Sequence, residues 1–299
     1  MDRSYRFVVI PKVSHPWFDE VVKGARGQAE LLRKHAGVEI VVDYRPPSQA
    51  SLVEQDEILA KAASTRPDGI ALDPVDAVSR ITAIQAVKDA KLPMVLFDAP
   101  PTGLGIPTVG NDFARQGVMA AEYLVELLAG RGKVALMRGV PSAPNHDERY
   151  RAQLSVLKRH PEIVVIDGGT DNDDIETARQ QAAAVLTANP DLSGYLCCDA
   201  AGPIGIAAAL RQAHRVGTLK VVGMDGIRPI LEAITEGVIQ ASSSTKPRMQ
   251  GSMAILMLWQ AALGAPIPSA IDTGIDVITR ESVAAFLEDA AEPAVASTR

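Results

Sequence analysis

Four short apolar segments of this 299-residue chain each stop at side chains that could contact a polar ligand. Such segments, when helical patterns follow them, are typical of buried parallel strands, and open α/β sheets bind ligands beyond the carboxyl ends of their strands. Carboxylates accept hydrogen bonds from hydroxyl groups, and aromatic faces suit the C–H faces of a sugar ring. The pattern therefore predicts one polar ligand that is contacted from several sides. The side chains are His15, Trp17 and Phe18 after segment 6–11, Asp98 after 94–97, Asp199 after 194–198 and Asp225 after 220–224.

Three further polar residues follow predicted strands and are candidate ligand contacts. Arg149 comes after segment 133–137, where a guanidinium could donate two parallel hydrogen bonds to paired hydroxyls or to a carboxylate. Thr245 and Lys246 follow segment 238–243. The residues alone leave structural alternatives open. Each aspartate could cap a helix, the aromatic pair could form a hydrophobic staple, and the arginine could be a solvated residue of a first helical turn.

The motifs of common enzyme classes are missing from the sequence. It contains no G-x-S-x-G, no G-x-x-x-x-G-K-[ST], no H-E-x-x-H and no G-x-G-x-x-G after the first predicted strand. The run His146-Asp147-Glu148 cannot turn three consecutive side chains toward one metal ion. The adjacent Cys197 and Cys198 are expected to be buried free thiols, because neighbours in a strand point to opposite faces. We therefore expect no catalytic residues, no metal and no cofactor.

The composition is that of a globular protein rather than a nucleic-acid-binding one. Apolar residues make up 47% of the chain, charged residues 22%, and the formal net charge is −6 with scattered Lys and Arg. No apolar stretch approaches the roughly 20 residues that span a bilayer. The N-terminus enters a predicted strand without an apolar leader region, which leaves open a cytosolic protein or a mature form whose leader has been removed.

The candidate residues are positioned by an alternation of strands and helices that runs along nearly the whole chain. Strict βα alternation with short loops predicts parallel sheets covered by helices on both faces. The predicted strands are 6–11, 38–42, 69–72, 94–97, 108–110, 133–137, 164–167, 195–198, 219–224 and 238–243, with a short extended segment at 272–278. The predicted helices are 18–36, 52–63, 78–91, 113–128, 148–159, 173–188, 204–214, 229–236, 247–262 and 282–289.

The alternation restarts near residues 111–112, which predicts two similar lobes rather than one large sheet. The last segments are too small for a third domain and are expected to cross back and complete both lobes. We expect an N-terminal lobe of residues 1–111 plus 246–275, a C-terminal lobe of 112–245 plus 276–290, and a frayed polar tail at 291–299.

At these residues the chain resembles the type I periplasmic binding proteins of the ribose-binding branch, the solute receptors of sugar ABC importers. The resemblance extends from Tyr5 to about Val283. Segment 14–18, S-H-P-W-F, is similar to the family's N-N-P-F-F, and segment 221–226, V-V-G-M-D-G, to its V-V-G-F-D-G. The resemblance implies ligand contacts at Trp17, Phe18, Asp98, Arg149, Asp199 and Asp225, at Thr245 in the position of a ligand glutamine, and at Asn172 in the position of a second-lobe aromatic.

The departures from the family pattern concern the ligand. Ala99 stands where ribose receptors carry an arginine, His15 replaces an asparagine, and Asn172 replaces the aromatic residue. The resemblance therefore implies that ribose is not bound in the usual way. Ligand contacts from His15, and from Lys246 if it faces the ligand, would suit another pentose, a polyol or cyclitol, or a sugar acid.

The resemblance implies a non-catalytic receptor with two doubly wound parallel-sheet α/β lobes joined by a three-segment hinge near 111–112, 244–245 and 273–276. The lobes would close around a sugar, polyol or sugar acid, and the membrane subunits of an ABC importer would recognise the closed form. A monomeric periplasmic protein that binds no nucleic acid is expected. The first alternative is the effector-binding core of a LacI-like transcription regulator that lacks its DNA-binding head, and the second is an enzyme on a doubly wound scaffold.

Overall fold

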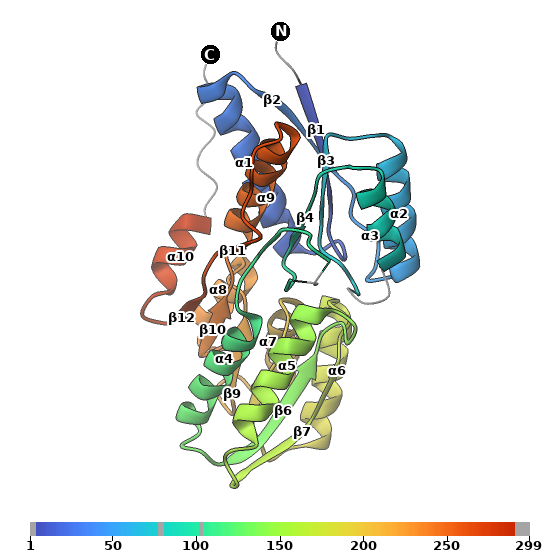
Figure 1. Cartoon of the computed structure of the whole chain (residues 1–299). Coiled ribbons are helices and arrows are strands. Elements are labelled where there is room, and N and C mark those ends of the chain that lie inside the picture. The colour runs from blue at the N-terminus through green and yellow to red at the C-terminus, as the bar shows by residue number, and fades with distance from the viewer. Residues whose placement is uncertain (1–3, 77–80, 102–103, 291–299) are drawn as a thin grey trace. The chain divides into compact units, whose positions relative to one another are not determined.

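The computed structural model of the chain describes residues 4–76, 81–101 and 104–290, and these form two compact units (Figure 1). The first unit comprises Met1–Phe113, Val140–Glu148 and Thr245–Ile275, and the second comprises Ala114–Gly139, Arg149–Ser244 and Asp276–Arg299. The expected lobe bounds differ from these by one or two residues at two crossings and coincide at the third, between residues 275 and 276. The sequence did not predict that Val140–Glu148 belongs to the first unit.

The first unit is built on a fully parallel six-stranded sheet of order β11-β5-β4-β3-β1-β2. Two helices, α1 and α9, pack against each other on one face, and α2 and α3 cover the other (Figure 1). The strands are β1 (Ser4–Ile10), β2 (Glu39–Tyr44), β3 (Gly69–Leu72), β4 (Met94–Phe97), β5 (Thr108–Gly110) and β11 (Ala270–Asp272). The helices are α1 (Pro16–Ala36), α2 (Leu52–Ser64), α3 (Ile81–Asp89) and α9 (Pro247–Ala262).

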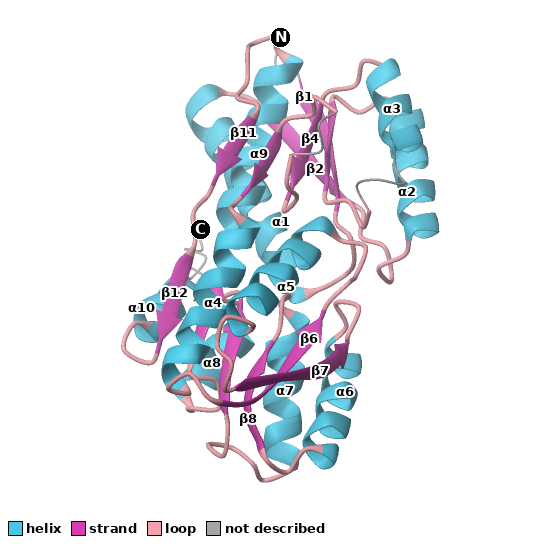
Figure 2. Cartoon of the chain, turned by 60° about the horizontal axis from the view of Figure 1, so that its bottom comes forward, coloured by secondary structure: helices cyan, strands magenta, loops and turns pink. Residues whose placement is uncertain are grey.

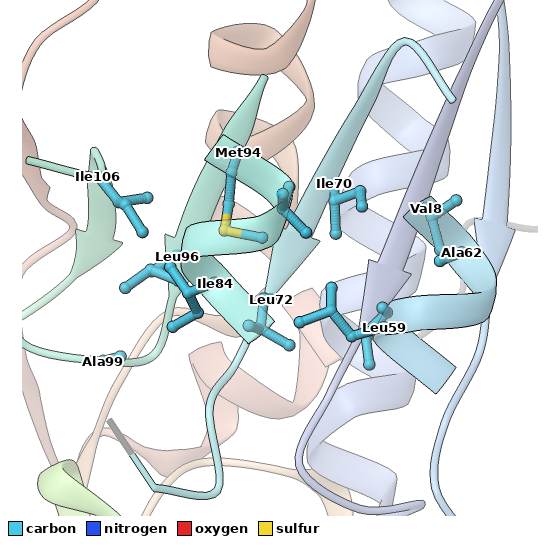
Figure 3. Close-up of a cluster of buried hydrophobic side chains, with 12 residues drawn as sticks. Val8, Leu59, Ala62, Ile70, Leu72, Ile84, Met94, Leu96, Ala99 and Ile106 are labelled. Atoms are coloured by element: carbon cyan, nitrogen blue, oxygen red, sulfur yellow. The ribbon is translucent and has the colours of Figure 1, made fainter. Parts of the chain in front are cut away.

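The core between this sheet and helices α2 and α3 consists of side chains from three adjacent strands (Figure 3). Val8 from β1, Ile70 and Leu72 from β3 and Leu96 from β4 meet Leu59 from α2. These strands are apolar over nearly their whole length, as expected where both faces of a parallel sheet are covered. Apart from Arg6 in β1, their polar residues therefore lie only at the strand ends.

The second unit repeats this strand order as β12-β10-β9-β8-β6-β7. Figure 2 shows β6, β7, β8 and β12 of this sheet among the helices of the unit. All its strand pairs are parallel except β12 with β10, which is antiparallel and which the sequence did not reveal. The strands are β6 (Gly132–Arg138), β7 (Ile163–Thr170), β8 (Leu192–Leu196), β9 (Lys220–Met224), β10 (Ala241–Ser244) and β12 (Asp276–Thr279). The helices are α4 (Phe113–Leu127), α5 (Pro144–Leu157), α6 (Ile175–Ala188), α7 (Ala201–Gln212), α8 (Arg228–Thr235) and α10 (Val283–Ala290). The first turn of α5, up to Glu148, is grouped with the first unit.

Helices also cover the second sheet on both faces. Side chains of α4 and α5 share one hydrophobic core with β6, β8, β9 and β10. On the other side α7 packs against both α6 and α8. The doubly wound α/β class predicted from the sequence is thus confirmed in both units.

Several predicted element bounds were wrong for local reasons. Helix α5 begins at Pro144 rather than at residue 148, because proline is preorganised for a first helical position. Strand β10 begins at Ala241 rather than at 238, because the N–H groups of Val238 and Ile239 close helix α8 by donating to the carbonyl of Ala233. Strand β8 ends at Leu196, two residues before the predicted end. The predicted start of α3 at 78 and the tail at 291–299 lie outside the described residues.

In the first unit, α1 and α9 approach each other at two glycines. A Cβ atom on Gly24 would lie 1.9 Å from the carbonyl oxygen of Arg248, which is shorter than any possible van der Waals contact. A Cβ atom on Gly251 would lie equally close to the carbonyl oxygen of Val21. Both neighbouring atoms belong to helix backbone, so neither can give way by a change of rotamer. The close packing of these helices therefore requires glycine at both positions.

We expect Gly251→Ala to lower the free energy of unfolding by about 1–3 kcal/mol, because the added methyl group must push two helix backbones apart. Gly27→Ala is the matched control, since this α1 glycine has open space at its Cβ position. The control should instead raise the free energy of unfolding by roughly 0.5–1 kcal/mol. Urea denaturation of both variants measures the effect, and equal changes would refute the packing argument.

Candidate functional site

The candidate site of the first unit lies at the carboxyl ends of β1, β3 and β4. Strands β1 and β3 are neighbours, but their following helices, α1 and α3, cover opposite faces, so the sheet has its topological switch point there. Gln55 from α2 fixes both strand ends, because its amide donates to the carbonyls of Pro11 (2.6 Å) and Asp73 (2.8 Å) and accepts from the N–H of Val75 (3.1 Å).

A buried lysine connects these strand ends. Lys12 follows β1 and is 0% exposed. Its Nζ lies 2.9 Å from Oδ2 of Asp73 and 3.4 Å from Oδ2 of Asp98, and 5.5 Å from the ring centre of Phe18. One cation thus holds two carboxylates and contacts the aromatic pair. Neither Lys12 nor Asp73 was among the predicted site residues, although both follow directly on apolar segments.

Asp98 has a constrained conformation. Its φ of 46° lies in the left-handed region, which aspartate tolerates better than most residues. Its N–H donates to the carbonyl of Val109 and to Oε1 of Gln250, both at 3.0 Å, and its Oδ2 accepts from Nδ2 of Asn145 at 2.6 Å. The described loop after β4 begins no helix at Asp98, so the capping alternative is wrong for this residue.

The predicted aromatic and histidine residues begin helix α1 and are buried. The rings of Trp17 and Phe18 meet edge-on with centres 5.0 Å apart, and Phe18 also contacts Phe97 at the end of β4. His15 is the N-cap of α1, where its Nδ1 accepts from the N–H of Trp17 at 3.1 Å. In neutral histidine the hydrogen is then on Nε2, and this buried donor has no hydrogen-bond partner among the described residues.

The last two predicted residues of the first unit lie at the start of α9. The hydroxyl of Thr245 is buried and accepts from Nε1 of Trp17 at 3.1 Å. Lys246 is the half-buried N-cap residue of α9, and its side chain makes no capping bond. The first unit therefore brings together His15, Trp17, Phe18, Asp98 and Thr245 through the contacts described above.

In the second unit Asp225 occupies the position that Asp98 has in the first. Asp225 follows β9, has a φ of 70°, and donates its N–H to the carbonyl of Ser243 in β10 at 2.8 Å. Its own carbonyl accepts from the hydroxyl of Ser242 at 2.6 Å. Helix α8 begins only at Arg228 without a side-chain cap, so Asp225 is not a helix cap either.

Arg149 lies in the second turn of α5 and is 2% exposed, so the solvated alternative is wrong. Its Nε donates to Oε1 of Gln116 at 2.7 Å, and its Nη1 lies 3.4 Å from the carbonyl of Cys198. The carbonyl of Cys197 accepts from Nε2 of Gln153 at 2.7 Å. Helix α5 therefore holds the β8–α7 turn that carries Asp199.

The turns after β7 and β8 bring two buried carboxyl groups together. Oδ1 of Asp199 accepts from the N–H of Gly202 at 3.1 Å, so this residue does stabilise the start of α7, as one alternative proposed. Oδ1 of Asp171 accepts from the N–H of Asp173 at 2.9 Å. Asn172, the predicted site residue between Asp171 and Asp173 in the sequence, has an exposed side chain, whereas these two aspartates are buried.

Burial controls the proton affinities of these groups. Desolvation, with the nearby Asp173 carboxylate, raises the pKa of Asp199 to about 7. Desolvation and the adjacent Asp199 raise the pKa of Asp171 well above its usual value. Burial likewise raises the pKa of the Cys197 and Cys198 thiols, which are free, as predicted, and stay neutral.

Among residues 4–76, 81–101 and 104–290, no group of three or more His, Cys, Asp or Glu side chains has an arrangement that could hold a metal ion. In the same residues no helix combines the length and apolarity that crossing a membrane requires.

A family model described as a periplasmic binding protein domain matches residues 6–266. The chain belongs to this family. Membership in the periplasmic binding protein family implies a periplasmic or otherwise extracytoplasmic location, and it confirms the resemblance read from the sequence.

Individual relatives of this periplasmic binding protein carry sugar names. The D-apiose import binding protein of Actinobacillus succinogenes is 24% identical over 79% of this chain and 74% of its own. A solute-binding protein of Agrobacterium vitis, solved with α-D-tagatopyranose, is 25% identical with a TM-score of 0.85 and coverage of 94% and 98%. One from Burkholderia graminis, solved with D-arabinose, is 26% identical with a TM-score of 0.85 and coverage of 93% and 96%.

These comparisons confirm the type I periplasmic binding protein fold and the prediction that the chain is a transport protein rather than an enzyme. They favour neither the regulator nor the enzyme alternative. The roles of the individual site residues stay a prediction.

We expect Lys12→Met to lower the free energy of unfolding by about 3–5 kcal/mol, because it leaves two buried carboxylates without their shared cation. Adding Asp73→Asn should recover part of this loss. Lys133→Met is the matched control, since it breaks an exposed pair with Asp191 and should cost no more than about 1 kcal/mol. Equal losses from the two lysine variants in urea denaturation would contradict a buried charge network.

The raised pKa of Asp199 also gives a pH dependence. A carboxyl whose pKa is higher in the folded than in the unfolded state adds stability at low pH, and this stability is lost as the pH rises through the folded pKa, here about 7. Unfolding free energy should therefore fall between pH 5 and pH 8 by on the order of 1–4 kcal/mol relative to Asp199→Asn. Parallel pH profiles of the two proteins would show that Asp199 titrates normally.

Proposed function

We propose that this periplasmic binding protein is the receptor for a neutral sugar or polyol and delivers it to an ABC importer. The observation that carries the proposal is the pair Asp98 and Asp225. Asp98 follows β4 and Asp225 follows β9, which hold the same position in the strand orders of the two sheets. Each residue has a left-handed backbone conformation, and each is buried. Strained, buried carboxylates at strand ends are costly to fold and are typical of functional sites.

The charges of the candidate site support a ligand rich in hydrogen-bond donors. In the first unit Lys12 faces Asp73 and Asp98. In the second unit four buried carboxyl groups surround the turns after β7, β8 and β9, with Arg149 as the neighbouring buried cation. Hydroxyl groups can donate to such carboxylates, whereas a ligand carboxylate would be repelled. We therefore favour a neutral ligand over the sugar acid that the sequence left open.

The aromatic residues of the first unit support a ring-shaped ligand. Trp17 and Phe18 are fixed by mutual packing, by Phe97 and by the Trp17–Thr245 hydrogen bond. The relatives named above bind a tagatose ring, arabinose or apiose according to their names, so pentoses, hexoses and their polyols are the classes to test first. His15, Lys246, Arg149, Asn172 and Asp199 are proposed as further contacts.

The remaining parts of the proposal concern transport. The protein would act as a monomer outside the cytoplasm, would bind no nucleic acid, and would close by a hinge movement in the three segments that connect its units. The closed form would be recognised by the membrane subunits of the importer. Small-angle X-ray scattering with and without sugar tests the hinge movement.

We expect a thermal-shift screen of D-tagatose, D-arabinose, D-allose, D-ribose, xylitol, myo-inositol and D-gluconate to identify at least one neutral ligand and to reject the acid. Asp98→Asn and Asp225→Asn should each weaken that ligand's Kd by about 100-fold or more, because a hydroxyl loses its charged acceptor. Asparagine tolerates the left-handed backbone, so the fold should persist.

Asp191→Asn is the control for this experiment, because Asp191 is an exposed residue in an ion pair with Lys133. It should leave the Kd unchanged in calorimetry. Near-normal affinity in both site variants would contradict the proposed site, and no binding by any neutral member of the panel would contradict the proposed function.

A further inference from the structure

The two buried acids Asp171 and Asp199 of the second unit come from different turns, one after β7 and the other after β8. They are 0% and 1% exposed, respectively. Each uses its Oδ1 atom for a backbone N–H, that of Asp173 or that of Gly202. Each Oδ2 atom is buried and has no hydrogen-bond donor among the described residues.

The two carboxyl groups lie within hydrogen-bonding reach of each other. Two carboxylates cannot bond, because each offers only acceptors. A carboxylic acid next to a carboxylate can bond through a single proton, which would provide both orphaned oxygens with a partner. The geometry therefore requires that one of the two groups carries a proton.

The surroundings reinforce this requirement. Asp173 beside Asp171 and Asp225 at the end of β9 both add negative charge to Asp199. The buried thiols of Cys197 and Cys198 and the phenol of Tyr195, which donates to the carbonyl of Gly168, are uncharged neighbours.

The nearby cations do not neutralise the pair. Arg149 from α5 reaches the carbonyl of Cys198 and Gln116. At the end of β6 the guanidinium of Arg138 stacks on Tyr150, 4.0 Å from the ring centre. No ion pair between either arginine and Asp171 or Asp199 is present in the described part of the chain.

We propose that Asp171 is a positioning residue for the ligand-binding carboxyl of Asp199 and that the two carboxyl groups share a proton without ligand. At lower pH Asp199 takes up a second proton, and a ligand hydroxyl that binds Asp199 displaces this second proton to solvent. Proton release on ligand binding rests on the proposed receptor function. The acid pair of Asp171 and Asp199 is independent of that function.

The proton balance follows from the hydrogen bonds. As the pH falls through about 7, Asp199 of the unliganded protein takes up a proton of its own in addition to the shared one. A ligand hydroxyl keeps its own hydrogen and donates it to Asp199, which accepts best as a carboxylate. The acid proton of Asp199 therefore goes to the buffer, while protonated Asp171 continues to donate to Asp199. Binding should then become tighter as the pH rises toward neutrality.

The acid pair is tested without any ligand. In NMR titration of protein labelled with 13C at the aspartate carboxyls, two coupled carboxyls should titrate with apparent pKa values well above the usual range of aspartate. Asp199→Asn and Asp171→Asn should each leave one of the two titrations, whereas Asp174→Asn, which changes the exposed cap of α6, should leave both. Normal titration of every aspartate would overturn the acid pair.

The positioning role is tested with D-tagatose, D-arabinose, D-allose and D-ribose. Since Oδ1 of Asp171 accepts from the N–H of Asp173, Asp171→Asn places a permanent N–H where the shared proton lies. This variant should keep the wild-type Kd at pH 7 within about threefold, while Asp171→Ala should weaken it about tenfold or more. Equal Kd values for Asp171→Asn and Asp171→Ala would overturn the positioning role.

Proton release is measured by calorimetry at pH 6 in phosphate and in a buffer of high ionisation enthalpy. Wild type and Asp171→Asn should release up to one proton per bound sugar. Their affinity for the sugar should also rise about tenfold from pH 5 to pH 7. Asp199→Asn should show neither proton release nor this pH dependence. Sugar binding without proton release would overturn this inference and leave the receptor function intact. If no sugar binds, the receptor proposal fails, and the NMR titration alone decides the acid pair.

Discussion

Charge burial at the carboxyl edges of the two sheets is the constraint on which the rest of the structure depends. Parallel strands deliver their polar end residues to one edge, where the apolar sheet faces offer them no partners. An unpaired carboxylate in such a place is strongly destabilising, so each unit must supply compensation from its own elements. In the first unit this is Lys12 between Asp73 and Asp98, with Asn145 as an additional donor.

The two units share a strand order but compensate their carboxyl groups differently. A buried glutamine in the first turn of a long helix, Gln250 in α9 and Gln116 in α4, fixes the strand ends of each sheet. The first unit then uses a permanent cation, whereas we propose a shared proton in the second. In this proposal the compensation in the first unit comes from a lysine side chain, and that in the second depends on pH and on ligand hydroxyls.

Local sequence patterns were sufficient for the fold class and for the residues that end strands. Asp98, Asp225 and the aromatic pair were predicted because an apolar segment stops directly before them. Lys12 and Asn145 were missed because their roles depend on contacts with Asp98, which is 86 and 47 residues away in sequence. In the turn after β7 two consecutive residues, Asn172 and Asp173, have positive φ, so no simple periodicity shows which side chain points inward.

The sequence also posed a choice between structural and ligand-binding roles, and the hydrogen bonds show that these roles are compatible. Asp199 uses one oxygen for the start of α7, Asp171 uses one for its own turn, and His15 uses Nδ1 for the start of α1. Each local bond fixes the side chain and thereby the direction of its second polar atom. A side chain held in this way loses little entropy when it binds, so the capping bonds themselves would prepare the proposed ligand contacts.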